Sequence, residues 1–162
     1  FAIYHIAIQP DGKIILGGDG FRLYRLNSDG SLDNTFLNCD CAGYAKKIYI
    51  QPDGKIVLIN QSIIIRLNSN GSLDNTFKKI TGFNENLNGS IKDAVVESNG
   101  KILVVGHFTK YNNHNHPYIL RFNSVGDVDG AIDSGEGFNS PIYSIFKDSN
   151  EKIWVVGIFN YY

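Results

Sequence analysis

The sequence has few of the features that mark membrane or nucleic-acid-binding proteins. No apolar run approaches the ~20 residues that a membrane-spanning helix needs, so no membrane insertion is predicted. Fifteen Lys and Arg residues against 16 Asp and Glu residues give a net charge of −1. That balance leaves no basic stripe for nucleic acid, and the pairs Lys46-Lys47 and Lys78-Lys79 are expected to be solvated surface. With 43% hydrophobic and 19% charged residues, the chain has the composition of a globular domain.

Cysteine is scarce, and catalytic signatures are missing. The two cysteines, Cys39 and Cys41, form a C-x-C pair whose short span suits disulfide geometry poorly, and no further zinc ligands stand at familiar spacings. We therefore expect two free thiols. No Gly-x-Ser-x-Gly elbow or phosphate-binding P-loop is present. The acidic residues lie mostly in repeated positions, so we expect a protein that is not an enzyme.

What the sequence does contain is a repeat of about 40 to 50 residues. Residues 25–36, RLNSDGSLDNTF, return almost unchanged at 66–77 and in altered form at 121–132. Four lysines mark the same point in successive units: Lys13, Lys55, Lys101 and Lys152. A turn with Asp-Gly, Asn-Gly or, in the fourth unit, Asn-Glu precedes each lysine. Because only the fourth turn lacks glycine, we expect it to be a looser loop.

Each unit predicts four short antiparallel strands. The strand after the turn, as in residues 56–59, is apolar without interruption and must bury both faces. A third strand follows, and a Ser-Leu-Asp segment forms a short fourth strand. No segment has the apolar spacing and caps of a helix. Face-to-face stacking of such sheets predicts an all-β fold, a partial β-propeller of about three and a half four-stranded blades.

The whole chain, 1–162, is predicted to be a single propeller fragment. Its repeat units fall at about 3–43, 44–89, 90–140 and 141–162, the last incomplete. Three and a half blades do not close a ring, which usually needs 4 to 8. The remaining blades come either from the rest of the same polypeptide or from several chains that complete the ring together. The start at a residue other than Met and the end inside a unit favour a fragment of a longer protein.

Three stretches of the repeat match a known pattern. They are residues 6–18 (IAIQPDGKIILGG), residues 25–33 (RLNSDGSLD) and residues 105–112 (VGHFTKYN). With them the chain resembles the delta-60 repeat β-propeller family along essentially its whole length, and the last stretch resembles the family's Gly-x-Phe-Thr-x-Tyr-Asn element. The resemblance implies a non-enzymatic structural or interaction module of a larger extracellular, cell-surface or virion protein, such as a phage tail protein. The first two units lack the Phe-Thr-x-Tyr-Asn element.

Two charged columns stand eight residues apart in the repeat. They consist of the arginines Arg25, Arg66 and Arg121 and the aspartates Asp33, Asp74 and Asp129. A ring of such pairs could bind a ligand. Arginine more often satisfies a carboxylate structurally, through its planar fork of donors, and the regular repetition favours this structural interpretation.

The turns of the opening motif resemble, faintly, an oxygen-rich calcium loop. Asn27-x-Asp29-Gly30 and Asn68-x-Asn70-Gly71 supply oxygen ligands. Hydrogen bonding to the turn backbone explains the same residues, and Val125 replaces the central position of the third copy. No cofactor is predicted, with Ca²⁺ as the alternative.

The least repetitive polar stretch, residues 107–117, is the candidate site for a partner or glycan. The candidate contacts are His107, Phe108, Tyr111, Asn112, Asn113, His114 and His116. His114 and His116 offer a partial metal site, which His107 completes only if the loop folds back. A plain solvated loop is the alternative.

Partners are predicted to be neighbouring blades or subunits and a cell-surface protein or glycan. The leading hypothesis is a rigid disc whose loops and exposed aromatics, Phe108 and Tyr111, meet a partner. The first alternative is a glycan-binding propeller with Tyr44, Tyr111 and Tyr118 as contacts, because the single Trp154 falls in a strand expected to be buried. The second alternative is a polysaccharide lyase or hydrolase.

Overall fold

The computed structural model describes residues 2–19, 22–39, 45–84, 91–130 and 137–161. In these ranges every regular element is a β-strand, so the all-β prediction is confirmed. Nowhere in these ranges is there a helix that could cross a membrane. The chain divides into two compact units, Phe1–Lys79 and Ile80–Tyr162.

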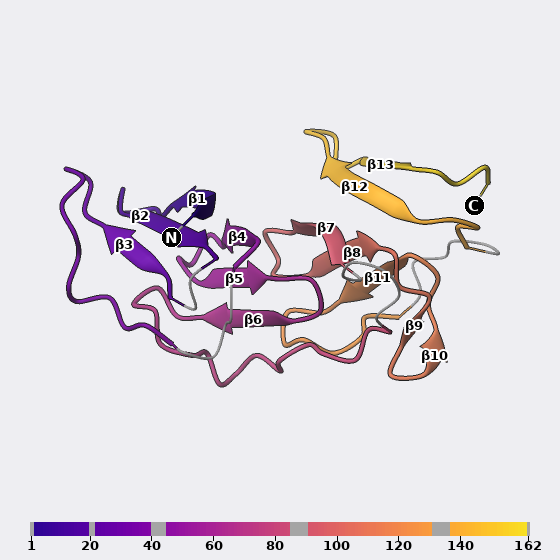
Figure 1. Cartoon of the computed structure of the whole chain (residues 1–162), viewed down its shortest axis with the longest axis horizontal. Coiled ribbons are helices and arrows are strands. Elements are labelled where there is room, and N and C mark those ends of the chain that lie inside the picture. The colour runs from indigo at the N-terminus through magenta and orange to yellow at the C-terminus, as the bar shows by residue number, and fades with distance from the viewer. Residues whose placement is uncertain (1, 20–21, 40–44, 85–90, 131–136, 162) are drawn as a thin grey trace. The chain divides into compact units, whose positions relative to one another are not determined.

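The first unit contains two three-stranded antiparallel sheets, which we call blades 1 and 2. Blade 1 is built from β1 (Ile3–Ile8), β2 (Ile14–Gly18) and β3 (Tyr24–Leu26). Blade 2 is built from β4 (Lys47–Ile50), β5 (Ile56–Ile59) and β6 (Ile64–Leu67). In both blades the uninterrupted apolar strand, β2 or β5, lies in the middle (Figure 1).

The second unit contains blade 3, blade 4 and a short hairpin. Blade 3 is built from β7 (Ile91–Val96), β8 (Ile102–Gly106) and β11 (Ile119–Phe122), with β8 in the middle. Blade 4 is the pair β12 (Ile142–Lys147) and β13 (Ile153–Gly157). The hairpin pairs β9 (Lys110–Tyr111) with β10 (His114–Asn115).

The predicted fourth strand is shorter than expected. It is reduced to one isolated bridge after each third strand, at Leu26–Leu32, Leu67–Leu73 and Phe122–Val128. The hydrogen bonds of these bridges include the one from the amide of Asp33 to the carbonyl of Arg25, at 2.8 Å, and the one from the amide of Asp74 to the carbonyl of Arg66, at 3.0 Å.

The fourth turn is not the looser loop that the sequence predicts. Glu151 stands where the first turn has Gly12, and it adopts the same left-handed backbone, with φ of 65° against 82°. Its amide donates to Asp148 O at 3.0 Å, as Gly12 donates to Gln9 O at 2.9 Å. The hydrogen bonds of the turn therefore hold a non-glycine residue in a conformation that glycine adopts at lower cost.

Each unit has a cluster of buried apolar side chains between its two blades. In the first unit Gly17 permits blades 1 and 2 to approach each other closely, because a Cβ at that position would come within 2.7 Å of Ile48 Cδ1. The buried side chains around it include Ile15 and Leu23 of blade 1 and Leu58 of blade 2. Each blade therefore acts as one layer of a stack.

Cys39 does not carry the free thiol that the sequence analysis expects. It is disulfide-bonded, while Cys41 lies outside the described residues. The short span between the two cysteines was expected to exclude disulfide geometry. The requirement is a Cα separation of about 4.4–6.8 Å, and sequence spacing alone does not rule that out.

Candidate functional site

The repeated aspartate of each of blades 1 to 3 lies at the centre of a three-residue ion-pair cluster. In blade 1, Asp33 Oδ2 lies 2.7 Å from Lys13 Nζ and 2.8 Å from Arg25 Nε. In blade 2, Asp74 Oδ2 lies 3.1 Å from Lys55 Nζ and 2.7 Å from Arg66 Nε.

Blade 3 repeats this arrangement, with Asp129 Oδ2 2.9 Å from both Lys101 Nζ and Arg121 Nε. The repeated lysines, which the sequence analysis used only as position markers, thus complete the clusters. Their recurrence directly after the turn of each copy was the signal that could have identified them.

The clusters of blades 1 and 2 are closed by a threonine and a phenylalanine. Thr76 donates to Asp74 Oδ1 from its hydroxyl at 2.6 Å and from its amide at 2.9 Å. The Arg66 guanidinium lies 4.8 Å from the centre of the Phe77 ring. Burial alone would raise the pKa of Asp74, but hydrogen bonds from Thr76, Arg66 and Lys55 outweigh it and hold the pKa well below its ordinary value. The carboxylate therefore stays charged in the folded protein.

The blade 1 cluster also joins the two blades of the first unit. Arg25 Nη1 donates to the carbonyl of Ser69 at 2.7 Å, and Gln9 Nε2 donates to the same carbonyl at 3.1 Å. The charged columns thus have partners inside the repeat, and in blade 1 the cluster also bonds to the neighbouring blade.

The polar turn residues that resembled a calcium loop are engaged by their own turn. Asp29 Oδ1 accepts hydrogen bonds from the amide and the hydroxyl of Ser31, at 2.9 and 2.7 Å. Asn70 Oδ1 accepts the same two bonds from Ser72. No group of three or more His, Cys, Asp or Glu side chains that could hold a metal occurs in the described part of the chain.

Phe108 and Tyr111, expected to be exposed contacts, are buried. Phe108 is fully buried, and the Tyr111 ring lies 5.1 Å from the ring of Phe83 and 5.2 Å from that of Phe122. The expectation of exposure is wrong because residues 82–84 cover the hairpin: Asn112 N donates to Gly82 O at 2.9 Å, and Phe83 forms a bridge with Tyr111. The two aromatic residues stabilise the hairpin from inside.

The polar end of the hairpin is exposed. Asn112, Asn113 and His114 lie on the surface, and His116 is half-buried. Burial and the neighbouring His114 lower the pKa of His116 below 6.5. His107 contacts a different element, since its ring lies 5.2 Å from that of Tyr143.

The aromatic residues proposed for glycan binding have different environments. Tyr44 lies outside the described residues. Tyr118 is half-buried, with φ of 67°, and packs against the core of the second unit. Trp154, expected to be buried, is exposed, and its indole Nε1 donates to Asp148 Oδ2 at 2.9 Å. The expectation that Trp154 is buried required both faces of β13 to be covered.

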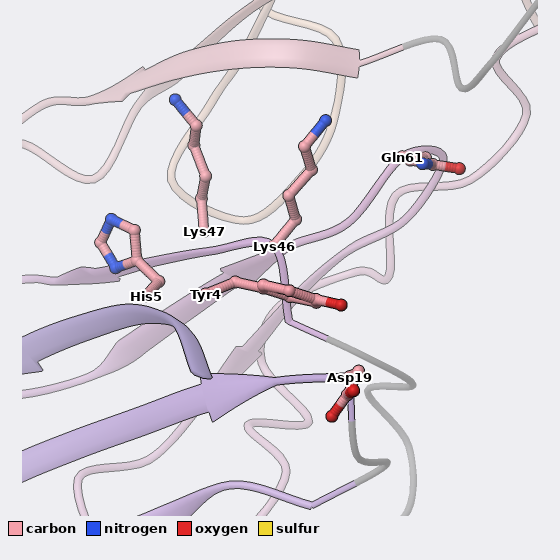
Figure 2. Close-up of a pocket in the computed structure, with 6 residues that line it drawn as sticks. All are labelled: Tyr4, His5, Asp19, Lys46, Lys47 and Gln61. Atoms are coloured by element: carbon pink, nitrogen blue, oxygen red, sulfur yellow. The ribbon is translucent and has the colours of Figure 1, made fainter. Parts of the chain in front are cut away.

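A cleft of about 620 Å³ lies in the first unit, in a region that the sequence analysis did not single out as a site. Its lining side chains are Tyr4, His5, Asp19, Lys46, Lys47 and Gln61. Tyr4 and His5 come from β1, Lys47 is the first residue of β4, and Lys46 directly precedes that strand (Figure 2). The lysine side chains extend to the same side of the cleft, away from Asp19 (Figure 2).

The cleft combines positive charge with a neutral imidazole and an exposed ring. Burial and the charge of Lys47 lower the pKa of His5 below 6.5, so the imidazole is neutral at pH 7. Its Nδ1 is buried and has no hydrogen-bond partner in the described structure. Asp19 Oδ1 accepts a hydrogen bond from the amide of Ala2 at 2.8 Å. Lys46 and Lys47 are half-buried, so the expectation of fully solvated surface does not hold for this pair.

The corresponding repeat positions in the second unit are also polar. His107 follows β8 as Asp19 follows β2, and Asp93 and Ser144 take the places of His5 and Lys47 in their strands. There Asp93 Oδ2 accepts hydrogen bonds from Ser144 Oγ at 2.8 Å and from Ile145 N at 3.1 Å. Asp93 therefore joins blades 3 and 4.

Comparison with known proteins agrees with this architecture. A family profile described as "Domain of unknown function (DUF5122) beta-propeller" matches residues 9–36, 51–77 and 97–131. No curated protein matches the chain.

Solved structures show the fold at low sequence identity. The Pan2 WD40 domain of Neurospora crassa matches with a TM-score of 0.63 and 12% identity, over 98% of this chain and 44% of that one. The extracellular domain of the one-component system protein BT4673 from B. thetaiotaomicron matches with a TM-score of 0.60 and 19% identity, over 98% of this chain and 21% of that one. The chain therefore spans less than half the length of either structure. At these identities the likeness concerns the fold alone.

The family and the fold predicted from the repeat are both confirmed. The sheets described above are blades of a β-propeller, and the chain belongs to the DUF5122 β-propeller family.

Proposed function

We propose that this chain is a non-enzymatic binding module of a larger extracellular protein, and that the cleft of the first unit receives a negatively charged group of its partner. The observation that carries the proposal is the cleft itself, in which two lysines stand beside Tyr4 and His5 around about 620 Å³. That volume falls in the range of ligand sites in proteins, about 300–1,000 Å³.

The charge distribution favours binding of an anion. Among the described residues that line the cleft, Lys46 and Lys47 bring two ammonium groups and Asp19 brings one carboxylate. The neutral imidazole of His5 has one donor and one acceptor nitrogen, of which Nδ1 is buried. A carboxylate or sulfate group would therefore meet attraction from the lysines together with a hydrogen-bonding side chain.

The absence of an enzymatic role is part of the proposal. Proton transfer near pH 7 needs a group whose pKa lies near that pH. The pKa values of Asp33 and Asp74 are instead lowered, mainly by the hydrogen bonds that hold these carboxylates in their clusters. These carboxylates suit a structural role better than acid–base chemistry.

An extracellular location has two supports. Cys39 is disulfide-bonded, and disulfides persist mainly in oxidising compartments outside the cytosol. One of the similar structures is the extracellular domain of a bacterial protein. Within this location, attachment to a cell surface or to a virion such as a phage tail agrees with the delta-60 resemblance.

Glycan binding is the second candidate function, and Tyr4 favours it. The exposed Tyr4 ring lines the cleft, and an aromatic ring offers an apolar face beside polar groups. An acidic glycan would combine ring contact with attraction to the lysines. The exposed hairpin residues Asn112 to His114 are the proposed second contact for a protein partner.

A binding screen with charge-matched probes tests the proposal. Acidic oligosaccharides and acidic peptides are compared with neutral counterparts, and the hits are titrated calorimetrically at two salt concentrations. We expect an acidic probe to bind, with an affinity that falls as salt rises. Lys47→Ala should weaken binding at least about tenfold, whereas Lys79→Ala, an exposed lysine outside the cleft, should leave it unchanged. An affinity that Lys47→Ala leaves unchanged, or no binding by any acidic probe, would contradict the proposal.

A further inference from the structure

The cleft of the first unit is lined from three aligned positions of the repeat, each filled by both blades. Position 2 is the residue of a blade's first strand whose partner across the sheet is Gly17 in blade 1 and Ile59 in blade 2. Position 1 is the residue before it, and position 3 follows that partner by two residues. In the order of the positions, with blade 1 named first, the lining pairs are Tyr4 and Lys46, His5 and Lys47, and Asp19 and Gln61.

The second unit fills position 2 with a carboxylate. Asp93 of blade 3 pairs with Val105, and Ser144 of blade 4 pairs with Val156, so both stand at position 2. Asp93 Oδ2 accepts the hydrogen bonds from Ser144 Oγ at 2.8 Å and from the amide of Ile145 at 3.1 Å. A carboxylate of the chain itself thus links the first strands of these two blades, β7 and β12.

In the first unit, position 2 holds two nitrogen-bearing side chains, His5 and Lys47 (Figure 2). A lysine ammonium only donates hydrogen bonds. The Nδ1 atom of His5 is buried and has no hydrogen-bond partner within the described ranges. Because a buried N–H without an acceptor is costly, we expect the neutral ring to carry its proton on Nε2, which then donates. Position 2 of the first unit therefore presents donors, whereas Asp93 gives the second unit an acceptor there.

We infer that the cleft binds a carboxylate of an acidic saccharide, held by Lys47 and by Nε2 of His5 between β1 and β4, as the Asp93 carboxylate is held between β7 and β12. The inference rests on the proposed function and names the group that the cleft receives. A carboxylate accepts charge-assisted hydrogen bonds from an ammonium group, so the ligand supplies the anionic acceptor that Asp93 supplies in the second unit. Tyr4, at position 1 of blade 1, lines the same cleft and offers a ring face for the apolar side of a sugar.

Calorimetric titration with three probes tests the chemical class. Tetragalacturonate carries a carboxylate on each sugar, its methyl ester has the same sugars without the charge, and a tetraglutamate peptide has the charge without sugars. We expect tetragalacturonate to bind, the ester to bind at least about tenfold more weakly because it lacks the charge-assisted hydrogen bonds, and the peptide to bind more weakly because it lacks the ring contact. An ester that binds as tightly as the acid would overturn the carboxylate, and a peptide that binds as tightly would overturn the saccharide.

A carboxylate built into blade 1 tests where the ligand binds. His5→Asp gives position 2 of blade 1 the residue that blade 3 has there, so the new carboxylate should pair with Lys47 and fill the place of the ligand. The affinity for tetragalacturonate should then fall at least about tenfold, and the midpoint of urea unfolding should rise because the pair links two blades. His5→Asn is the matched control, since it has the same shape without the charge, and its midpoint should stay below that of His5→Asp. Gln61→Glu adds one negative charge to the cleft at position 3 and should not raise the midpoint.

The outcomes separate this inference from the proposed function. If no acidic probe binds the unaltered chain, the proposed function fails and this inference fails with it. If tetragalacturonate binds the unaltered chain and His5→Asp equally well, or if the midpoint of His5→Asp does not exceed those of His5→Asn and Gln61→Glu, the inference is overturned while the proposed function stands. Loss of tetragalacturonate binding in His5→Asp together with its raised midpoint supports the inference.

Discussion

The ion-pair clusters of blades 2 and 3 contain the same three kinds of charged residue in two different environments. The Asp74 side chain of blade 2 is 3% exposed, whereas the Asp129 side chain of blade 3 is 26% exposed. Both lie 2.7–2.9 Å from the Nε of their arginine. The distance alone therefore does not distinguish a buried ion pair from a partly solvated one.

The sequence beside each cluster accounts for the difference. Blade 2 follows Asp74 with Thr76, which hydrogen-bonds the carboxylate, and Phe77, which covers the Arg66 guanidinium. The third repeat has Ala131 and Ile132 at these positions, outside the described residues. An alanine has no hydroxyl to donate, and an isoleucine offers no ring face for a guanidinium. We therefore expect the neighbours of the repeated charges to decide how much those charges contribute to the free energy of unfolding.

Removing the carboxylate is the change with the largest expected effect. Asp74→Ala leaves Arg66 buried without its partner and should cost about 3–5 kcal/mol of unfolding free energy. Asp129→Ala should cost only a small fraction of that, because the side chains of Arg121 and Asp129 are 32% and 26% exposed. Urea unfolding of the two variants measures both values. Equal losses of unfolding free energy at the two sites would contradict the expected difference between blades 2 and 3.

Removing the threonine hydroxyl should have an intermediate effect. Thr76→Val deletes the 2.6 Å hydrogen bond to Asp74 Oδ1 while keeping the shape of the side chain. It should cost about 1–2 kcal/mol and raise the pKa of Asp74, which NMR titration of the carboxyl carbon measures. Thr81→Val is the control, since Thr81 is exposed and lies outside the cluster. An unchanged pKa in Thr76→Val would show that the hydroxyl does not hold the charge.

Acid should destabilise the protein through the same clusters. Hydrogen bonds from Lys13 and Thr35 are the main cause that lowers the pKa of Asp33, and Thr76, Arg66 and Lys55 act likewise on Asp74. A carboxyl whose folded pKa is lowered stabilises the fold above its unfolded pKa of about 3.9 and loses that contribution as pH falls toward the folded pKa. Stability measured between pH 7 and 2 should therefore fall mainly below about pH 4. Asp74→Asn should flatten this acid limb more than Asp129→Asn does.

The lysine of the cluster should contribute least to the free energy of unfolding. Lys55 Nζ lies 3.1 Å from Asp74 Oδ2, but its side chain is partly exposed. Lys55→Met keeps the apolar stem and should cost about 0.5 kcal/mol, an effect that salt reduces. A loss as large as that of Asp74→Ala, measured by the same urea unfolding, would mean that Lys55 and not Arg66 is the main partner.

Much of the fold could be predicted from the sequence because the same pattern of turns and strands recurs in several repeat units. The turn at Gly12 recurs in each unit, and the uninterrupted apolar strand 56–59 indicated a sheet buried on both faces. The failures occur where a single copy departs from the repeat. Glu151 was expected to loosen its turn, yet backbone hydrogen bonds hold it in the glycine conformation. Trp154 was predicted to be buried because of its aligned position in the repeat, although the sequence does not show whether another blade covers that face of β13.

The candidate site could be predicted less well, for a spatial reason. Tyr4 and Lys46 line the same cleft only because β1 and β4 belong to neighbouring blades, and no local spacing encodes that contact. Phe108 and Tyr111 were taken as exposed because they stand in a polar stretch, but the segment that covers them, residues 82–84, lies far away in sequence. Aligned positions of the repeat identify the residues that recur in each blade. A site built from unrepeated residues of two blades can be recognised only in the structure.

Two double-mutant cycles test most directly the claim that neighbouring residues, and not the charges themselves, decide the strength of the repeated ion pairs. The cycles combine Arg66→Ala with Asp74→Ala and Arg121→Ala with Asp129→Ala, and urea unfolding gives the coupling energy of each pair. We predict a coupling of about 2 kcal/mol or more between Arg66 and Asp74, and a much smaller coupling between Arg121 and Asp129 that vanishes at high salt. Equal couplings in the two blades, or a stronger one in blade 3, would contradict the account.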